Sequence, residues 1–286
     1  MAPDEQPGRY LVVGNPIAHS RSPEIHAAFA EQTGQRIAYT RRLIDTEPAD
    51  AFTHEMRRFF TEEGGLGANV TLPFKEAACR LADVLSSRAE AAGAANTLSW
   101  VDGQIVADNT DGVGLVNDIE QRLKVALVGR RITVLGAGGA ARGLMLPLAQ
   151  AGADRLVVAN RTLSRAQALA EDINRYLYAE RIAVRVEAVS LSDAPCADIL
   201  INATSAGLKD EGPGLPDTLF TGCRLAYDCI YADRPTPFLR RAVSAGVALC
   251  SDGLGMLVGQ AAESFRIWRG VMPDVACVLA RLRPDG

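Results

Sequence analysis

A glycine-rich turn between a predicted strand and a predicted helix constrains the fold of this chain more than any other feature. The apolar run 132–135 leads into Gly136-Ala137-Gly138-Gly139-Ala140-Ala141-Arg142-Gly143, and a helical pattern follows to Ala151. Glycines allow so tight a turn, and they let backbone amides at a helix N-terminus approach a pyrophosphate. A simple helix start is the alternative reading. Because further strands are predicted at 156–159, 183–188, 198–202 and 225–231, we expect a Rossmann-type α/β domain.

The end of the next predicted strand indicates which dinucleotide is bound. It carries Asn160-Arg161-Thr162, with Arg165 one helical turn later, and it has no acidic residue to bind the ribose hydroxyls. Two guanidinium groups are suited to a 2′-phosphate, so NADP(H) is favoured over NAD. Alternatively, Arg165 lies on a solvent-exposed helix face and binds no cofactor. The small, hydroxyl-rich strand end Ala203-Thr204-Ser205 is expected to line the same cofactor.

The first third of the chain alternates between strand and helix patterns. Strands are predicted at 9–13, 36–44 and 66–70, helices at 23–30 and 47–60, and a further helical region at 75–92. Such alternation implies a mainly parallel sheet with helices on its faces. Asp102-Gly103 lies between two runs of alternating hydrophobicity, which predicts a tight hairpin.

Lys75 is the residue on which the functional hypothesis is centred. The chain has 30 Lys+Arg but only three lysines, so 30 − 3 = 27 of its cations are arginine. A shielded amine can give up a proton, whereas a guanidinium cannot. Pro73 predicts that Lys75 lies in the first turn of a helix, where the helix dipole disfavours the ammonium form. The alternatives are a proton donor or acceptor and an ordinary solvated lysine.

Four other polar residues each have a structural and a functional interpretation. Ser20 and Ser22 precede a helix that Pro23 opens, so one hydroxyl is expected to cap it and the other to be available to a ligand. Asp111 is either the N-cap of a helix at 113–123 or a carboxylate facing Lys75, which would stabilise the lysine's charged form. Gln260 lies in an apolar helix. It is either a core residue whose side chain forms hydrogen bonds to the backbone, or a ligand contact.

Composition excludes several classes of protein. A net charge of −4 and a pI near 5.5 give no basic footprint for nucleic acid or anionic lipid. The six scattered cysteines indicate a reducing compartment, and the three histidines have no metal-ligand spacing. No apolar run reaches the length of a membrane span, and the acidic first six residues do not resemble a signal peptide. We therefore expect a cytoplasmic protein without a metal.

Nine short motifs in the right order together resemble the shikimate dehydrogenases over almost the whole chain. They are Gly14 to Pro23, Asn69 to Lys75, Ala94 to Thr97, Asn109 to Gly112, Gly136 to Ala140, Asn160 to Thr162, Asn202 to Ser205, Tyr227-Asp228 with Tyr231, and Asp252 to Gln260. The resemblance implies NADPH-dependent, reversible reduction of 3-dehydroshikimate to shikimate, on the pathway to chorismate and the aromatic amino acids. It also implies two domains, 1–111 with 253–286 for substrate and 112–252 for NADP, with the active site in the cleft between them.

The resemblance further implies the role of individual residues. Lys75 would be the acid/base and Asp111 its partner. The hydroxyls and carboxylate of shikimate would be held by Ser20, Ser22, Thr71, Lys75, Asn96, Asp111, Tyr231 and Gln260. The NADP site would comprise Gly136, Ala137, Gly138, Gly139, Ala140, Asn160, Arg161, Thr162, Arg165, Thr204, Ser205, Cys229 and Gly253.

Three residues depart from the usual family pattern, and several alternatives stay open. Ala27, Ser87 and Cys229 stand where the family often has asparagine, an acid and methionine, which affects fine cofactor geometry and not the reaction. The nearest rival is a quinate/shikimate dehydrogenase using NAD. A second is a non-catalytic NADP-binding sensor, and a third acts on an amino- or otherwise modified shikimate. The oligomeric state is expected to be monomer or homodimer.

Overall fold

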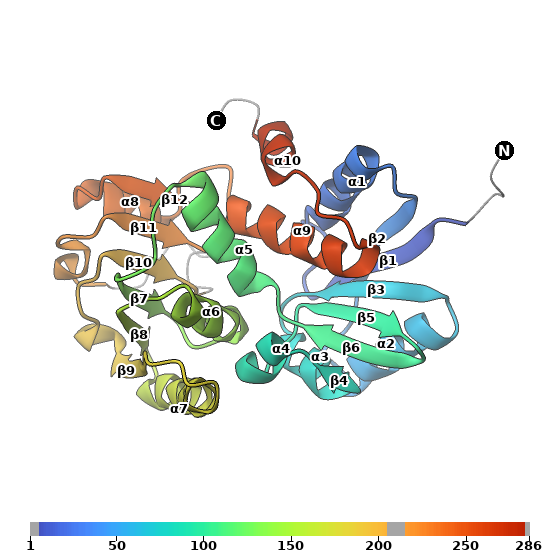
Figure 1. The fold of residues 1–286 in the computed structure, drawn as a ribbon, viewed down its shortest axis with the longest axis horizontal. Helices are drawn as coiled ribbons and strands as arrows, with labels where there is room; N and C mark the ends of the chain where they lie inside the picture. The colour runs from blue at the N-terminus through green and yellow to red at the C-terminus, as the bar shows by residue number, and fades with distance from the viewer. Residues whose placement is uncertain (1–5, 205–214, 284–286) are drawn as a thin grey trace. The chain divides into compact units, whose positions relative to one another are not determined.

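The protein forms two compact α/β units. The computed structural model describes residues 6–204 and 215–283, and the chain divides into residues 1–110 with 258–286 (unit 1) and 111–257 (unit 2). The chain passes from unit 1 to unit 2 after Thr110 and returns within a single helix, between Leu257 and Val258. Each unit contains one six-stranded sheet with its own helices (Figure 1). The two-domain α/β fold expected from the sequence is confirmed.

The sheet of unit 1 is mixed. Its strands are β1 (Gly8–Gly14), β2 (Ile37–Leu43), β3 (Gly65–Val70), β4 (Val84–Leu85), β5 (Thr97–Val101) and β6 (Gln104–Asp108), in the order β2-β1-β3-β5-β6-β4. The β2-β1-β3 half is parallel, as the alternation predicts, whereas β5 pairs antiparallel with both β3 and β6. The predicted hairpin is present: Val101 pairs with Gln104, and both Asp102 and Gly103 have positive φ angles.

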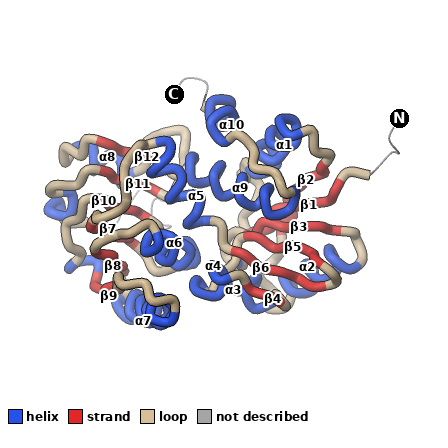
Figure 2. Tube along the Cα trace, in the orientation of Figure 1, coloured by secondary structure: helices blue, strands red, loops and turns tan. Residues whose placement is uncertain are grey.

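Most helices of unit 1 pack on this sheet, whereas the C-terminal helix packs on the N-terminal one. They are α1 (Ser22–Thr33), α2 (Ala51–Thr61), α3 (Lys75–Leu81), α4 (Ser87–Ala92), the later turns of α9 (Leu254–Arg269) and α10 (Val275–Leu282). In α2, for example, Phe52, Met56, Phe59 and Phe60 recur at helical spacing and are all buried in the core. Figure 2 shows α10 beside α1, and the other helices of unit 1 beside the strands of the sheet.

The helical region predicted at 75–92 is wrong as a single element. Strand β4 separates α3 from α4, because the backbone around Asp83 pairs with β6 instead of continuing the helix. Asp83 N donates to Ile105 O at 2.8 Å, and the Asp83 carboxylate accepts from Ile105 N at 2.8 Å. Ser86 then caps α4 by accepting from Ala89 N at 3.2 Å.

The sheet of unit 2 is entirely parallel. Its strands are β7 (Arg131–Leu135), β8 (Arg155–Asn160), β9 (Val186–Ser190), β10 (Ile199–Asn202), β11 (Leu225–Asp228) and β12 (Leu249–Ser251), in the order β12-β11-β10-β7-β8-β9. Its helices are α5 (Asp111–Asn117), continued by a π-helical turn (Asp118–Arg122), α6 (Gly139–Gln150), α7 (Leu163–Ala179) and α8 (Pro237–Ser244). This strand order is that of a doubly wound dinucleotide-binding sheet, in which the order reverses between β7 and β10.

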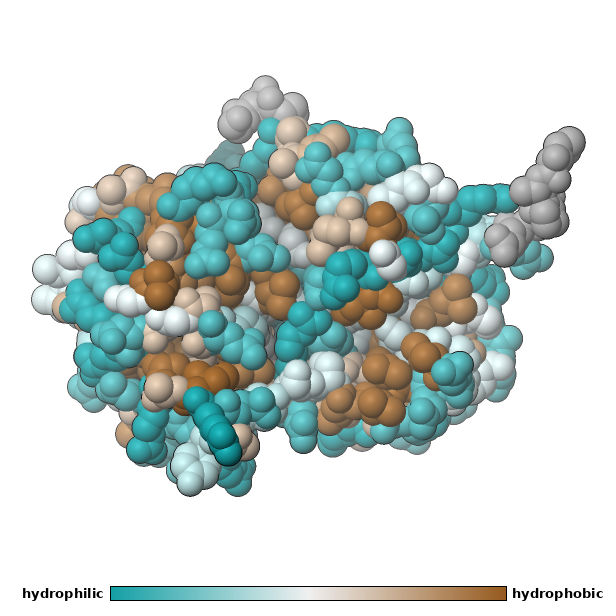
Figure 3. Space-filling model, in the orientation of Figure 1, coloured by the Kyte–Doolittle hydropathy of each residue, from teal (hydrophilic) through white to brown (hydrophobic). Residues whose placement is uncertain are grey.

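The surface carries both hydrophilic and hydrophobic residues. On the face shown in Figure 3, teal and brown residues alternate over each unit. Within residues 6–204 and 215–283, no helix has the length and apolar character that crossing a membrane requires.

Candidate active site

The turn after β3 lies against the end of β1 in unit 1. Thr71 N donates to Val13 O, and Asn15 N donates to Leu72 O, both at 2.9 Å. Gly14 makes this approach possible, because a Cβ there would press on the Thr71 methyl group and the Leu72 carbonyl. Thr71 therefore lies where two parallel strands end, the edge at which open α/β sheets bind ligands.

Lys75 is the first residue of α3 and is half-buried. Its carbonyl accepts a hydrogen bond from Ala95 N at 2.8 Å, which ties the start of α3 to the segment that precedes β5. The position at a helix N-terminus agrees with the prediction. Pro73, however, does not lie in the first helical turn: it follows a cis peptide bond in the turn before the helix, where Phe74 N donates to Thr71 O at 3.0 Å.

Ser20 and Ser22 lie side by side at the start of α1. Their hydroxyls are 3.2 Å apart, and Ser20 Oγ also accepts from Ser22 N at 3.3 Å. Arg21 occupies the N-cap position and provides no side-chain cap, while Pro23 stands in the first turn as predicted. Ser20 thus binds a backbone amide at the helix start, and Ser22 is buried beside it.

Asn96 and Gln260 meet directly, although 164 residues separate them. Asn96 Nδ2 donates to Gln260 Oε1 at 3.0 Å, and both side chains are at least nine-tenths buried. Asn96 O accepts from Val70 N at 2.8 Å, so this pair lies next to Thr71. Unit 1 therefore brings the loop after β3, the start of β5 and one face of α9 to the same edge of its sheet.

Behind this pair lies a buried polar cluster that the sequence did not predict. It joins β2, β3, β5, the residue before Asp111 and helix α9, and its members are Tyr39, Asn69, Asn96, Thr97, Thr110, Gln260 and Ser264. Two signals were available in the sequence: Asn69 interrupts an apolar strand, and Ser264 follows Gln260 at the i, i+4 spacing of one helix face. Neither signal says which distant residues are the partners.

Asp111 and Tyr231 belong to unit 2. Asp111 is the first residue of α5 and is 4% exposed, whereas Tyr231 is half-buried in the loop after β11. The start of α5 packs tightly on α6, because a Cβ at Gly112 would collide with the carbonyl of Gly143 and the ring of Pro147. The proposed pairing of Asp111 with Lys75 stays a prediction.

The glycine turn of unit 2 has the shape that a dinucleotide pyrophosphate requires. Gly136 has a φ of +107°, and a Cβ there would press on Ala203. Gly138 is the N-cap of α6, and nothing lies within 4 Å of the position its Cβ would occupy. Backbone amides at the start of α6 are therefore open to an anion that approaches closely over Gly138.

Two arginines stand at the end of β8, next to this turn. Gly136 N donates to Ala159 O at 2.8 Å, which brings Asn160 beside the glycine turn, and Asn160 Nδ2 donates to Thr162 O at 2.9 Å. Arg161 and Arg165 are exposed, and neither forms an ion pair with any residue in the described ranges. Their guanidinium groups suit a phosphate on the adenosine ribose.

The remaining predicted cofactor residues lie at the ends of β10 and β11. Thr204 donates through Oγ1 to Asn202 Oδ1 at 2.7 Å, and Cys229 N donates to Asn202 O at 2.8 Å. A Cβ at Gly253 would collide with the Cys229 carbonyl, so the close approach of these two backbone segments requires glycine. Ser205 lies outside the described residues.

Two buried acids form hydrogen bonds that stabilise this edge of unit 2. Asp228 accepts from Thr236 Oγ1 at 2.6 Å and from Asn202 Nδ2 at 3.1 Å, and its burial raises the pKa of its carboxyl. Asp118 accepts from Tyr227 Oη at 2.8 Å, while Tyr227 Oη accepts from Met256 N at 3.2 Å. These bonds hold the start of α9 and the loop after β10 in place.

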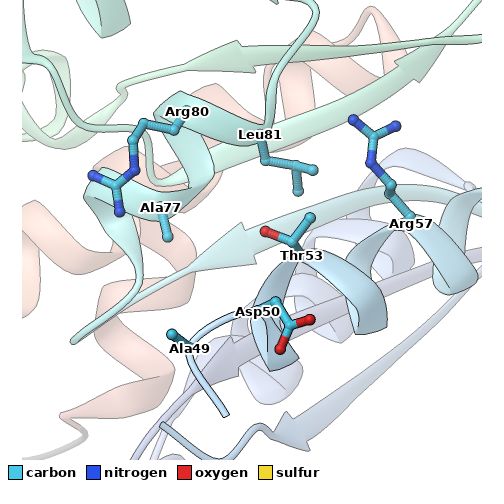
Figure 4. A pocket seen from close by; sticks show the side chains of 7 residues that line it. All are labelled: Ala49, Asp50, Thr53, Arg57, Ala77, Arg80 and Leu81. Carbon is cyan, nitrogen blue, oxygen red and sulfur yellow. The ribbon is translucent and has the colours of Figure 1, made fainter. Parts of the chain in front are cut away.

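A separate surface pocket of about 360 Å³ lies between α2 and α3 (Figure 4). None of the predicted site residues lines it; the lining residues are Ala49, Asp50, Thr53, Arg57, Ala77, Arg80 and Leu81. Figure 4 shows the guanidinium groups of Arg57 and Arg80 on opposite sides of the pocket, so they do not converge on one ligand.

Comparison with known proteins assigns the family. Three family models match along the chain: "Shikimate dehydrogenase substrate binding domain" at residues 12–98, "Shikimate / quinate 5-dehydrogenase" at 118–209, and "Shikimate 5'-dehydrogenase C-terminal domain" at 253–283. A shikimate dehydrogenase (NADP(+)) from Alkalilimnicola ehrlichii is 50% identical over 277 residues, covering 97% of this chain and 99% of the relative. The chain belongs to the shikimate dehydrogenase family.

Other relatives of this family agree in sequence and in fold. The shikimate dehydrogenase (NADP(+)) of Cupriavidus taiwanensis is 52% identical over 280 residues, covering 96% of this chain and 93% of the relative. The crystal structure of shikimate 5-dehydrogenase from Thermus thermophilus, in complex with NADP(H) and shikimate, has a TM-score of 0.81 and 36% identity. The match covers 94% of this chain and 96% of the Thermus thermophilus chain. The resemblance stated from the nine motifs is therefore confirmed at the level of the family.

Proposed function

We propose that this protein is an NADP-dependent shikimate dehydrogenase, which reversibly reduces 3-dehydroshikimate to shikimate. The observation that carries the proposal is the match of about half of all residues, over nearly the full length, to curated enzymes of that name. This reaction belongs to the pathway that leads to the aromatic amino acids. We also propose that the protein works in the cytoplasm, as a monomer or homodimer.

Unit 1 binds the substrate in this proposal. Hydroxyl and amide side chains gather where its strands β1 and β3 end, which suits a small ring bearing several hydroxyls and one carboxylate. The residues proposed as contacts are Ser20, Ser22, Thr71, Lys75, Asn96 and Gln260 from unit 1, with Asp111 and Tyr231 from unit 2.

Lys75 is the acid and base of the reaction. In the direction of reduction its ammonium group gives a proton to the oxygen of the ring ketone, and in the reverse direction the neutral amine takes that proton back. A positioned proton donor of this kind contributes roughly 10²–10⁴-fold to the rate. Asp111 orients the lysine and stabilises its charged form.

Unit 2 holds NADP(H). The open space over Gly138 and the start of α6 fit the pyrophosphate, and Arg161 with Arg165 fit the 2′-phosphate. Cys229 and Gly253, which follow strands β11 and β12, would contact the nicotinamide end of the cofactor. When bound, the nicotinamide supplies or takes up the hydride, and the protein orients the reactants and excludes water.

The test is a spectrophotometric assay of NADP⁺ reduction with shikimate. We expect a rate that saturates with shikimate and is lost in Lys75→Ala. A purified, folded protein that reduces no NADP⁺ with shikimate would overturn the proposed function.

A second candidate is dehydrogenation of quinate as well as shikimate. It is favoured by one observation, that the family model matched at 118–209 describes a shikimate / quinate 5-dehydrogenase. Initial rates with both acids and with NAD⁺ and NADP⁺ separate the two candidates. The exposed arginines at the end of β8 lead us to expect NADP⁺ and shikimate to give the highest kcat/KM.

A further inference from the structure

The hydroxyl of Ser264 is the centre of the buried polar cluster in unit 1. Its Oγ lies 2.7 Å from Thr97 Oγ1, 3.0 Å from Asn69 Nδ2 and 3.3 Å from Thr110 Oγ1. It also lies 3.0 Å from Gln260 O, four residues earlier in α9, so this carbonyl and Thr97 Oγ1 share the single proton of the serine. The Ser264 side chain is completely buried, so these protein groups take the place of water.

The orientation of the Asn69 amide is determined by its neighbours. Its Nδ2 lies 3.2 Å from Asn96 O, a backbone carbonyl that can only accept, so the nitrogen faces that carbonyl. Its Oδ1 then accepts from Tyr39 Oη at 2.7 Å. The second hydrogen of Nδ2 is directed to Ser264 Oγ, which leaves the serine proton to be donated onward.

The orientation of the Asn96 amide determines that of Gln260. Thr110 N can only donate and lies 2.9 Å from Asn96 Oδ1, so the oxygen of this amide faces Thr110. Thr97 Oγ1 donates to the same oxygen at 2.9 Å. Asn96 Nδ2 must therefore be the donor to its partner at 3.0 Å, which makes that partner Gln260 Oε1. The amide nitrogen of Gln260 is then the end turned away from Asn96.

We propose that Ser264 is a positioning residue, which holds this cluster in one hydrogen-bond direction so that Gln260 offers N–H donors, and not its oxygen, to the substrate. The group that Gln260 binds is accordingly an acceptor, such as a carboxylate oxygen or a hydroxyl lone pair. This inference rests on the proposed function for the identity of the substrate. The orientation of the Gln260 amide itself rests only on the cluster.

The first test is Ser264→Ala, which removes the hydroxyl and leaves the backbone of α9 unchanged. Asn69 Nδ2 and Thr97 Oγ1 each lose a partner. Asn96 Oδ1 keeps its bond from Thr110 N, but the Thr97 hydroxyl can then turn away from it, so Asn96 and Gln260 are held less firmly. We expect the KM for shikimate to rise roughly threefold to tenfold, the factor that one neutral hydrogen bond carries. The kcat and the KM for NADP⁺ should change by no more than about twofold. The lost interaction stabilises the bound substrate and the transition state equally, so its loss raises only the shikimate KM. Equal losses in all three constants, or none in the shikimate KM, would overturn the proposal.

Thr33→Val is the matched control. Thr33 Oγ1 donates to Phe29 O at 2.7 Å, the same bond to the residue four positions earlier, on α1 of the same unit. Within the described residues, the Thr33 hydroxyl makes no hydrogen bond to the cluster, and we expect its loss to leave the shikimate KM unchanged. A similar rise in both variants would show a general loss of stability in place of a positioning role.

Gln260→Glu provides a second test that keeps size and shape. One carboxylate oxygen can still accept from Asn96 Nδ2, but the outer end becomes an acceptor in place of a donor. We expect the dissociation constant for shikimate, measured by calorimetry, to rise at least about tenfold because an acceptor then faces an acceptor. Binding within about twofold of the wild type would mean that the oxygen of Gln260 faces the substrate, and would overturn the inference.

Side-chain amide resonances separate this inference from the proposed function. The NH₂ signals of Gln260 and Asn96 are assigned by their absence in Gln260→Glu and Asn96→Asp. We expect both to exchange slowly with solvent in the wild type and much faster in Ser264→Ala. If the wild type fails to oxidise shikimate, the proposed function falls, while the exchange of these amides still decides the orientation. Unchanged exchange in Ser264→Ala would overturn it.

Discussion

His26 is a buried base whose protonation should make the stability of unit 1 depend on pH. It lies in α1 and is completely buried, and neither ring nitrogen has a hydrogen-bond partner in the described part of the chain. Its ring is stacked on Tyr39 with centroids 4.2 Å apart, and the ring of Trp268 lies at 5.4 Å. Burial lowers the pKa of His26 from 6.5 to about 3, while the nearby Asn69 side chain opposes this shift.

The sign and size of the effect follow from linkage. Between its folded and unfolded pKa values, His26 is neutral in the folded protein and protonated in the unfolded chain. The unfolded state therefore binds more protons, and stability is lost as pH falls below 6.5 towards 3. One pKa unit corresponds to about 1.4 kcal/mol, so lowering the pH from 7 to 5 should cost unit 1 about 2 kcal/mol.

The assay is urea unfolding followed by tryptophan fluorescence at several pH values between 5 and 7. Both tryptophans of the chain, Trp100 and Trp268, belong to unit 1, so the signal reports on that unit. His26→Phe should flatten the dependence, because phenylalanine does not titrate and has no polar atom to leave unpaired. His54→Gln, at an exposed position, is the control and should retain the wild-type slope.

Two results would refute this reasoning about His26. The first is a wild-type free energy of unfolding that changes by less than about 0.5 kcal/mol between pH 7 and 5. The second is a His26→Phe variant with the wild-type slope, which would assign the pH dependence to other groups. The carboxylates with lowered pKa values, such as Glu63 and Glu263, titrate below this window and do not obscure it.

Three further predictions concern the site and its support. Lys75→Ala should lower kcat by roughly 10²–10⁴-fold and leave the KM for NADP⁺ nearly unchanged in steady-state assays; near-normal turnover would remove Lys75 from the mechanism. Arg161→Ser, and likewise Arg165→Ser, should raise the KM for NADP⁺ about tenfold or more without raising that for NAD⁺, and equal changes for both would contradict a 2′-phosphate contact. Tyr227→Phe should lower the stability of unit 2 by about 1–3 kcal/mol, because Asp118 loses a buried donor; an unchanged calorimetric midpoint would contradict this.

Local rules determined a large part of the fold in advance. The glycine turn at 136–143, the strand end at Asn160 and the hairpin at Asp102-Gly103 were each predicted from a few neighbouring residues. Turn geometry and hydrophobic period depend on residues that are close in the sequence, so the parallel sheet of unit 2 and the hairpin of unit 1 followed directly. The motif order was specific enough to indicate the family.

Long-range contacts were beyond the same reasoning. The helical pattern of 75–92 gave way to β4 because the tertiary pairing with β6 overrides local helix propensity. The antiparallel pairing of β3 with β5 likewise joins the predicted hairpin to the mainly parallel sheet. Both outcomes depend on a strand that lies elsewhere in the chain.

The sequence by itself determined the two α/β units, the cofactor turn and a set of candidate polar residues. Only the tertiary structure decided which of those residues touch. Asn69 and Ser264 are 195 residues apart and Asn96 and Gln260 are 164 apart, yet each pair is joined at 3.0 Å. No local pattern encodes such a pairing, because a buried donor is satisfied by whichever acceptor the packed core brings to it.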